Sequence, residues 1–155
     1  MQEMKAYVII GENDSGKSSV TRCLTGSGSS RIRPIATLSS NIRVYVHLSS
    51  LQEEKTAPAE LEGKVKPEDC EAVIFSLRPG KARGYPDADT YLQYFIKKGW
   101  HIIRVACLGD SASRITTSLP EGVIDTFPEV TASETEPAMP ANTVAAKVRA
   151  HFGWK

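Results

Sequence analysis

The sequence has little cysteine and no long apolar run, and both features narrow the class of protein. Cys23, Cys70 and Cys107 lie far apart and form no Cys-x-x-Cys pair, so neither a zinc site nor a disulfide framework is expected. No segment approaches the ~20 apolar residues that cross a bilayer. The apolar stretch near the N-terminus is also too short for a signal peptide. We therefore expect reduced thiols, no membrane partner and a cytoplasmic location.

The chain also lacks a strong net charge. Its formal net charge is +1, so no global field indicates binding to nucleic acid or to a membrane. Locally, acidic residues are absent between Asp14 and Glu53, whereas Lys and Arg are absent between Arg114 and Lys147. We interpret these two stretches as solvated surfaces of opposite sign.

The order of apolar segments predicts an α/β fold. With 155 residues, the chain is expected to form a single domain over residues 1–155. Short apolar runs predict about five strands, and helical spacing of apolar residues predicts helices between them. The expected strands cover residues 6–10, 42–48, 72–77, 102–108 and 123–127. A first helix is expected to carry Val20, Cys23 and Leu24 and to end at Gly26. Further helices are expected over 58–65, from Pro86 to Gly99, and over 142–152 with Asn142 as a cap. Residues 131–140 are expected to form a surface loop. Alternation of the two kinds of element predicts a mainly parallel sheet.

A glycine-rich turn between the first strand and the first helix carries the clearest chemical signal. Residues 11–18 read GENDSGKS and fit G-x-x-x-x-G-K-[ST] without a mismatch. Gly11 and Gly16 allow a tight turn and close approach of a ligand to the backbone. Lys17 is expected to reach the β- and γ-phosphates, and the Ser18 hydroxyl to bind Mg²⁺. The remaining expected phosphate-binding residues are Asn13, Asp14, Ser15 and Ser19, through their backbone N–H groups.

This segment resembles the Walker A loop of the P-loop NTPases, a resemblance that covers about the first 25 residues. The order of elements is similar to that of the compact members, the small GTPases and the small-molecule kinases. The resemblance implies a three-layer P-loop fold, with ATP or GTP as ligand and Mg²⁺ as cofactor. In a GTPase-like layout, Thr37 falls in the switch I region and is a second candidate Mg²⁺ ligand.

Two parts of the P-loop pattern are missing. A Walker B strand should end in an Asp, but the second and third predicted strands end in HLSS and SLRP, and Ser49 and Ser50 stand where the acid would be. No Asn-Lys-x-Asp guanine motif is present either. Asp110 lies near that place and either reads a guanine edge or caps the following helix.

A second basic segment, RPGKARG at residues 78–84, directly follows the third predicted strand. Loops at the carboxyl ends of parallel strands form the ligand crevice, so Arg78, Lys81 and Arg83 can approach the phosphates as part of a mobile lid. Arg78 is the candidate for neutralising charge during phosphoryl transfer. A solvated basic loop explains the same segment equally well.

Three functions fit these features. The first is a slow Mg²⁺-dependent nucleoside triphosphatase that depends on a protein partner or activator. The second is a small-molecule kinase with the 78–84 segment as its lid and Asp87 or Asp89 as its base. The third is a nucleotide-binding regulatory module with little or no turnover, which the missing Walker B acid favours.

Overall fold

The computed structural model describes residues 4–130 and 139–155 and contains one six-stranded sheet. The strand order is β2-β3-β4-β1-β5-β6, and every neighbouring pair is parallel except β2 and β3. The strands are β1 (Lys5–Ile10), β2 (Arg31–Ala36), β3 (Asn41–Ser50), β4 (Ala72–Leu77), β5 (His101–Leu108) and β6 (Ile124–Phe127). The predicted α/β class and mainly parallel sheet are therefore confirmed.

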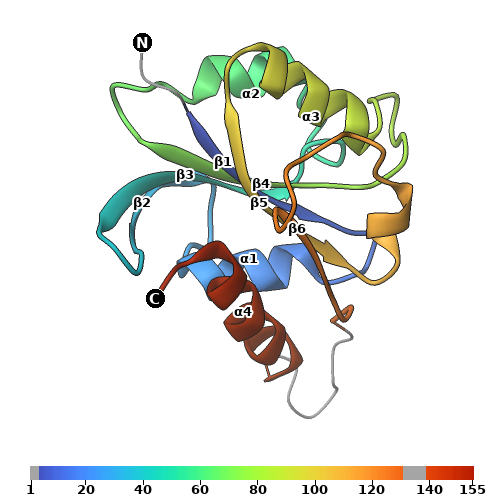
Figure 1. Cartoon of the computed structure of the whole chain (residues 1–155). Helices are drawn as coiled ribbons and strands as arrows, with labels where there is room; N and C mark the ends of the chain where they lie inside the picture. Colours follow the sequence, from blue (N-terminus) through green and yellow to red (C-terminus); the bar gives the residue numbers. More distant parts are fainter. Residues whose placement is uncertain (1–3, 131–138) are drawn as a thin grey trace.

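Helices cover both faces of the sheet and give three layers (Figure 1). One face packs against α1 (Lys17–Thr25) and α4 (Met139–Phe152), and the other against α2 (Pro58–Lys64) and α3 (Ala88–Lys97). A short 3₁₀ helix, η1 (Ser111–Arg114), follows β5. No helix within residues 4–130 and 139–155 is long and apolar enough to cross a membrane.

The central strands form because their sequences are almost wholly apolar. Every residue of β4 is buried, and so is every residue of β1 after Lys5. A strand covered on both faces needs this continuous apolar pattern rather than an alternating one. All three cysteines are free thiols, of which Cys70 and Cys107 are buried and Cys23 is half-buried.

Two expectations about the elements need correction. The structure adds β2, an edge strand where no element was predicted, so the sheet has six strands rather than about five. Helix α4 begins at Met139, so Asn142 lies within the helix and does not cap it. Most of the predicted 131–140 loop, namely residues 131–138, lies outside the described residues.

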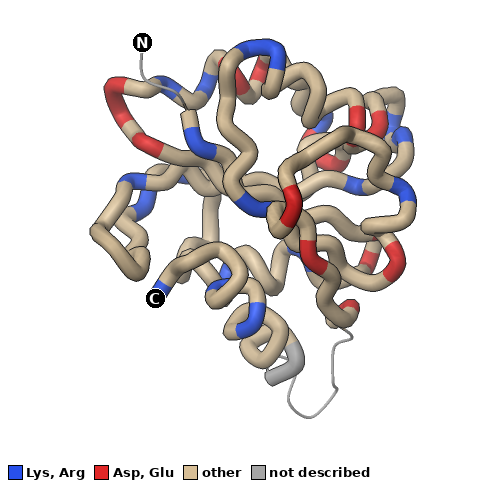
Figure 2. Tube along the Cα trace, viewed as in Figure 1, with Lys and Arg blue, Asp and Glu red and all other residues tan. Residues whose placement is uncertain are grey.

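The predicted separation of charge is visible in the sheet. Strands β2 and β6 form its two edges. Arg31 and Arg33 lie on β2, whereas Asp125 lies on β6 and Glu129 follows it (Figure 2). Among the described residues, the two edge strands of the sheet therefore carry charges of opposite sign.

Candidate functional site

The segment GENDSGKS, here called the GENDSGKS loop, leaves the carboxyl end of β1 and leads directly into α1. Gly16 adopts a left-handed conformation with φ 95° at the N-cap of α1, and Asp14 also has a positive φ of 64°. A Cβ on Gly16 would lie 2.5 Å from Cβ of Val130, whose backbone N–H donates to the Ser15 carbonyl at 2.8 Å. A Cβ on Gly11 would overlap the Ser15 side chain. Both glycines are therefore required by the shape of the loop.

The N-terminus of α1 has no capping side chain and no acidic residue in its first turn. The first N–H groups of any α-helix have no partner within the helix, and they carry its positive partial charge. In addition, the buried Ser15 Oγ has no hydrogen-bond partner within the described part of the chain. The loop thus gathers unused donors at one point, which is what an anion requires.

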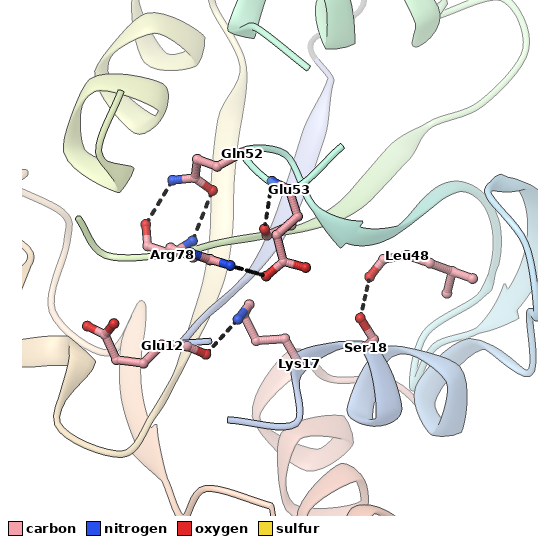
Figure 3. Close-up of polar contacts among 8 residues, drawn as sticks. Glu12, Lys17, Ser18, Leu48, Gln52, Glu53 and Arg78 are labelled. Carbon is pink, nitrogen blue, oxygen red and sulfur yellow. Dashed lines mark hydrogen bonds and ion pairs between the residues drawn. The ribbon is translucent and has the colours of Figure 1, made fainter. Parts of the chain in front are cut away.

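Lys17 is the first residue of α1 and is only 5% exposed. Its Nζ turns back across the loop and donates to the Glu12 carbonyl at 2.7 Å (Figure 3). Burial has the largest effect on the Lys17 pKa and lowers it, the Glu53 carboxylate acts in the opposite direction, and the Arg78 guanidinium lowers it further. An ammonium group held in a site that disfavours its charge will interact strongly with an incoming anion.

The other predicted loop residues lie around this lysine. The Ser18 hydroxyl donates to the Leu48 carbonyl at 3.4 Å, a long contact that a stronger partner can replace (Figure 3). Asn13, Asp14 and Ser19 are exposed, so their side chains do not block the loop. The side chain of Glu12 points away from the loop and pairs with Arg114.

Glu53 and Arg78 bring a carboxylate and a guanidinium to the same site. Arg78 directly follows β4, and its Nη2 and Nε lie 3.1 and 3.2 Å from Glu53 Oε1 (Figure 3). The two side chains are 20% and 29% exposed, so this pair is partly shielded from solvent. Both charges act on Lys17. The structure therefore brings Arg78 to the loop, as predicted, and adds Glu53, an acid that was not among the predicted site residues.

Gln52 fixes this pair in place. Its side chain is fully buried, accepts a hydrogen bond from Arg78 N–H and donates to the Arg78 carbonyl, both at 3.0 Å. It also donates to the Pro86 carbonyl at 3.2 Å. Because the Ser50 hydroxyl accepts from Glu53 N–H at 3.2 Å, the segment after β3 is held firmly against the end of β4. The only feature of the sequence that could have predicted this contact is LSSLQEE, in which polar residues directly follow an apolar strand.

Thr37 is not part of the site, which corrects its prediction as a Mg²⁺ ligand. It lies in the turn between β2 and β3, where Ala36 pairs with Asn41 at the amino end of β3. The GENDSGKS loop follows the carboxyl end of β1, which is parallel to β4 and therefore to β3. The two segments thus lie at opposite ends of these parallel strands. The Thr37 hydroxyl donates to the Ser40 carbonyl at 2.7 Å and closes its own turn.

The basic segment 78–84 contributes only Arg78 to the site. Arg83 has a φ of 53° and Gly84 a φ of 81°, and Ala82 and Tyr85 exchange two backbone hydrogen bonds, so the segment forms a small closed turn. Lys81 and Arg83 are exposed. A turn that is closed by its own hydrogen bonds does not resemble the mobile lid expected from the sequence.

The carboxylates of both candidate kinase bases, Asp87 and Asp89, accept hydrogen bonds from neighbouring residues of the fold. The Asp87 carboxylate accepts from Thr90 N–H at 2.9 Å and caps α3. The Asp89 carboxylate accepts from the N–H and hydroxyl groups of Thr116 and Thr117. Burial raises the Asp89 pKa, but these hydrogen bonds outweigh it and lower the pKa overall. A carboxylate held in this way is a poor proton acceptor.

A small cavity of about 140 Å³ adjoins the loop beyond the end of β5. Its lining includes Glu12, Asp110, Arg114 and Glu129. The Asp110 side chain makes no capping hydrogen bond to η1, although the helix starts directly after it. Three of its seven lining residues are acidic, and one of these, Glu12, is paired with Arg114.

Within the described residues, no cluster of three His, Cys, Asp or Glu side chains is arranged to hold a metal ion. The donors available are the Ser18 hydroxyl and the Glu53 carboxylate. Mg²⁺ commonly takes one or two protein oxygens and completes its shell with phosphate oxygens and water. The site therefore fits Mg²⁺ only together with a phosphate ligand.

Comparison of this chain with protein-family models, with curated proteins and with solved structures gives no match.

Proposed function

We propose that this chain binds a nucleoside triphosphate, ATP or GTP, in a P-loop formed by residues 11–18 and hydrolyses it slowly with Mg²⁺. The observation that carries the proposal is the buried Lys17 beside an uncapped helix N-terminus, with its ammonium group on the Glu12 carbonyl. A backbone carbonyl is a weak partner for a desolvated ammonium, and a polyphosphate is a strong one. The backbone N–H groups of the loop would hold the same phosphates.

The residues around the loop would have different roles in the hydrolysis. Mg²⁺, held by Ser18 and the phosphates, would neutralise the charge that develops on the phosphate oxygens. Once Arg78 pairs with the γ-phosphate, Glu53 would be released to orient the attacking water and accept its proton. A bond would form from the water oxygen to the γ-phosphorus as the bond to the bridging oxygen breaks, with the nucleoside diphosphate as leaving group. Arg78 would neutralise the transferred phosphoryl group. Since Arg78 is occupied by Glu53, slow turnover without an activating partner is the expected behaviour.

A nucleotide-binding module without turnover is the second candidate. Strands β3 and β4 end in Ser50 and Leu77, and neither strand places an Asp beside Ser18. The kinase alternative has less support, because Asp87 and Asp89 are both engaged in hydrogen bonds within the fold.

Thermal unfolding with ATP, GTP, ADP and GDP, each with and without Mg²⁺, tests binding. A ligand that binds only the native state stabilises it by about 2.7 kcal/mol at a hundredfold excess over Kd. We expect the triphosphates with Mg²⁺ to raise Tm, and Lys17→Ala to abolish the rise. Lys97→Ala, which removes an exposed lysine on α3, is the matched control.

The same nucleotides then separate the two candidates through phosphate release. Slow release that requires Mg²⁺ supports the hydrolase. Binding without release over hours supports the regulatory module. An unchanged Tm with every nucleotide, or a Lys17→Ala variant that binds as well as the natural chain, would refute the site.

A further inference from the structure

A hollow of about 420 Å³ lies beside the amino-terminal half of β5. β5 pairs with β1 from His101 onward, but β6 pairs with it only from Val105 to Leu108. Residues 101–104 therefore have no strand neighbour on that side of the sheet. The GENDSGKS loop follows the carboxyl end of β1, which is parallel to β5. The hollow therefore lies toward the amino ends of these strands and is separate from the nucleotide site proposed above.

The walls of the hollow are mainly apolar. They include Ile96, Trp100, Ile103, Leu119 and Val123. Ile96 is 39% exposed and is one of two large hydrophobic residues that are exposed in the described part of the chain. Small-molecule sites commonly measure about 300–1,000 Å³ and combine apolar walls with a few polar groups. The hollow has the size and the lining of such a site.

A bulge in β5 forms part of the wall of the hollow. Ala6 of β1 pairs with Ile102 and Tyr7 pairs with Arg104, so Ile103 is an extra residue in β5. A bulge changes the direction of the side chains that follow it, and bulges concentrate at sheet edges and beside functional sites. The residue that follows this bulge is Arg104, which also lines the hollow.

Arg104 is a partly buried cation with no acidic partner among residues 4–130 and 139–155. Its guanidinium donates instead to the carbonyl of its own neighbour, Ile103, at 2.7 Å. Glu121 lines the same hollow, but it is exposed and does not pair with Arg104. A guanidinium has five N–H donors arranged for a carboxylate, so most of its binding capacity is unused here.

We propose that this hollow binds a small apolar carboxylate, such as an aromatic or medium-chain aliphatic acid. The apolar body lies against Ile96, Trp100 and Leu119, and the carboxylate replaces the Ile103 carbonyl as the partner of Arg104. The apolar walls contribute affinity through burial, and the charge-assisted hydrogen bonds give selectivity for the acid. The site does not depend on nucleotide binding at the GENDSGKS loop.

Isothermal titration of the full chain with 2-naphthoate and with decanoate tests the proposal, with 2-naphthalenemethanol as the uncharged analogue. We expect both acids to bind more tightly than the alcohol. Arg104→Gln should weaken the acids by at least about tenfold, the size expected for a lost charge-assisted hydrogen bond, and leave the alcohol unchanged. Glu121→Gln should tighten the acids, because it removes a negative charge from the same hollow.

Two further variants keep the test specific. Lys17→Ala should leave the affinity for the acids unchanged, so this result separates the hollow from the proposed nucleotide site. Arg104→Lys retains the charge without the planar fork and should fall between the natural chain and Arg104→Gln, provided that both variants show the natural circular dichroism spectrum. No binding of either acid at millimolar concentration, or equal binding by the natural chain and Arg104→Gln, would overturn the proposal.

Discussion

Arg78 and Glu53 form an ion pair in which two guanidinium nitrogens contact one carboxylate oxygen, at 3.1 and 3.2 Å. They are 25 residues apart in the chain and meet because β3 and β4 are neighbours in the sheet. The charges of both residues affect the pKa of Lys17: Glu53 raises it and Arg78 lowers it. Under the proposed function, the two charges that would assist phosphoryl transfer are therefore paired with each other in this structure.

Glu53→Gln should separate binding from turnover. The substitution removes a negative charge from a site proposed for a polyanion and frees Arg78, so we expect nucleotide affinity to be equal or higher. Loss of the proton acceptor should slow phosphate release by about 10²–10⁴-fold. Nucleotide titration and a phosphate-release assay measure the two effects. Glu54→Gln, an exposed neighbour, is the matched control and should behave as the natural chain does. Weaker binding by Glu53→Gln with unchanged turnover would contradict the assigned role.

Gln52→Leu should destabilise the protein through the end of β4. Leucine cannot replace the hydrogen bonds to Arg78 N–H, the Arg78 carbonyl and the Pro86 carbonyl, and these groups lose their partner. Each unsatisfied buried group costs about 1–3 kcal/mol, so we expect the free energy of unfolding to fall by at least about 2 kcal/mol. Urea denaturation measures this loss, with Gln93→Leu on the exposed face of α3 as control. Equal stability of the two variants would show that Gln52 does not hold this segment.

The elements that the sequence predicted well are those whose pattern is local. β1 and β4 are continuous apolar runs, and the turn between β1 and α1 carries its own glycines at the positions that need them. β2 was missed because RIRPIA combines two arginines with a proline and lacks a clear period. Proline is tolerated in such a strand because an edge strand has one unpaired side.

The parts of the site that were missed depend on which strands become neighbours. Glu53 lies beyond the end of β3, and nothing in its local sequence indicates that β4 will bring Arg78 beside it. Thr37 was placed in the site by resemblance to the small-GTPase layout. The antiparallel pairing of β2 and β3 instead puts its turn at the amino end of β3, away from the GENDSGKS loop. Strand order is a long-range property, so neither outcome could be predicted from the residues alone.

Gly16→Ala should destabilise the protein more than glycine substitution at an unobstructed site. Both Gly16 and Gly99 have positive φ angles, 95° and 87°, and an alanine at either position costs about 1–2 kcal/mol in backbone strain. At Gly16 the new Cβ would also lie 2.5 Å from Val130, whereas nothing lies within 4 Å at Gly99. Overpacking of this kind adds about 1–3 kcal/mol. Denaturant unfolding of the two variants measures the difference, and equal losses would mean that the loop moves away from Val130 at little cost.

His47 should make stability depend on pH below its ordinary pKa of 6.5. Burial, the largest influence, lowers the pKa of His47, and its Nδ1 lies 2.8 Å from the Ser49 carbonyl. Because the folded chain has the lower pKa, the unfolded chain binds the proton first as pH falls, and the free energy of unfolding decreases below about pH 6.5. We expect Tm to fall between pH 7 and pH 5, and His47→Gln to lose part of this dependence. His101→Gln, at an exposed histidine, serves as the control. A pH profile that His47→Gln leaves unchanged would assign the effect to other groups.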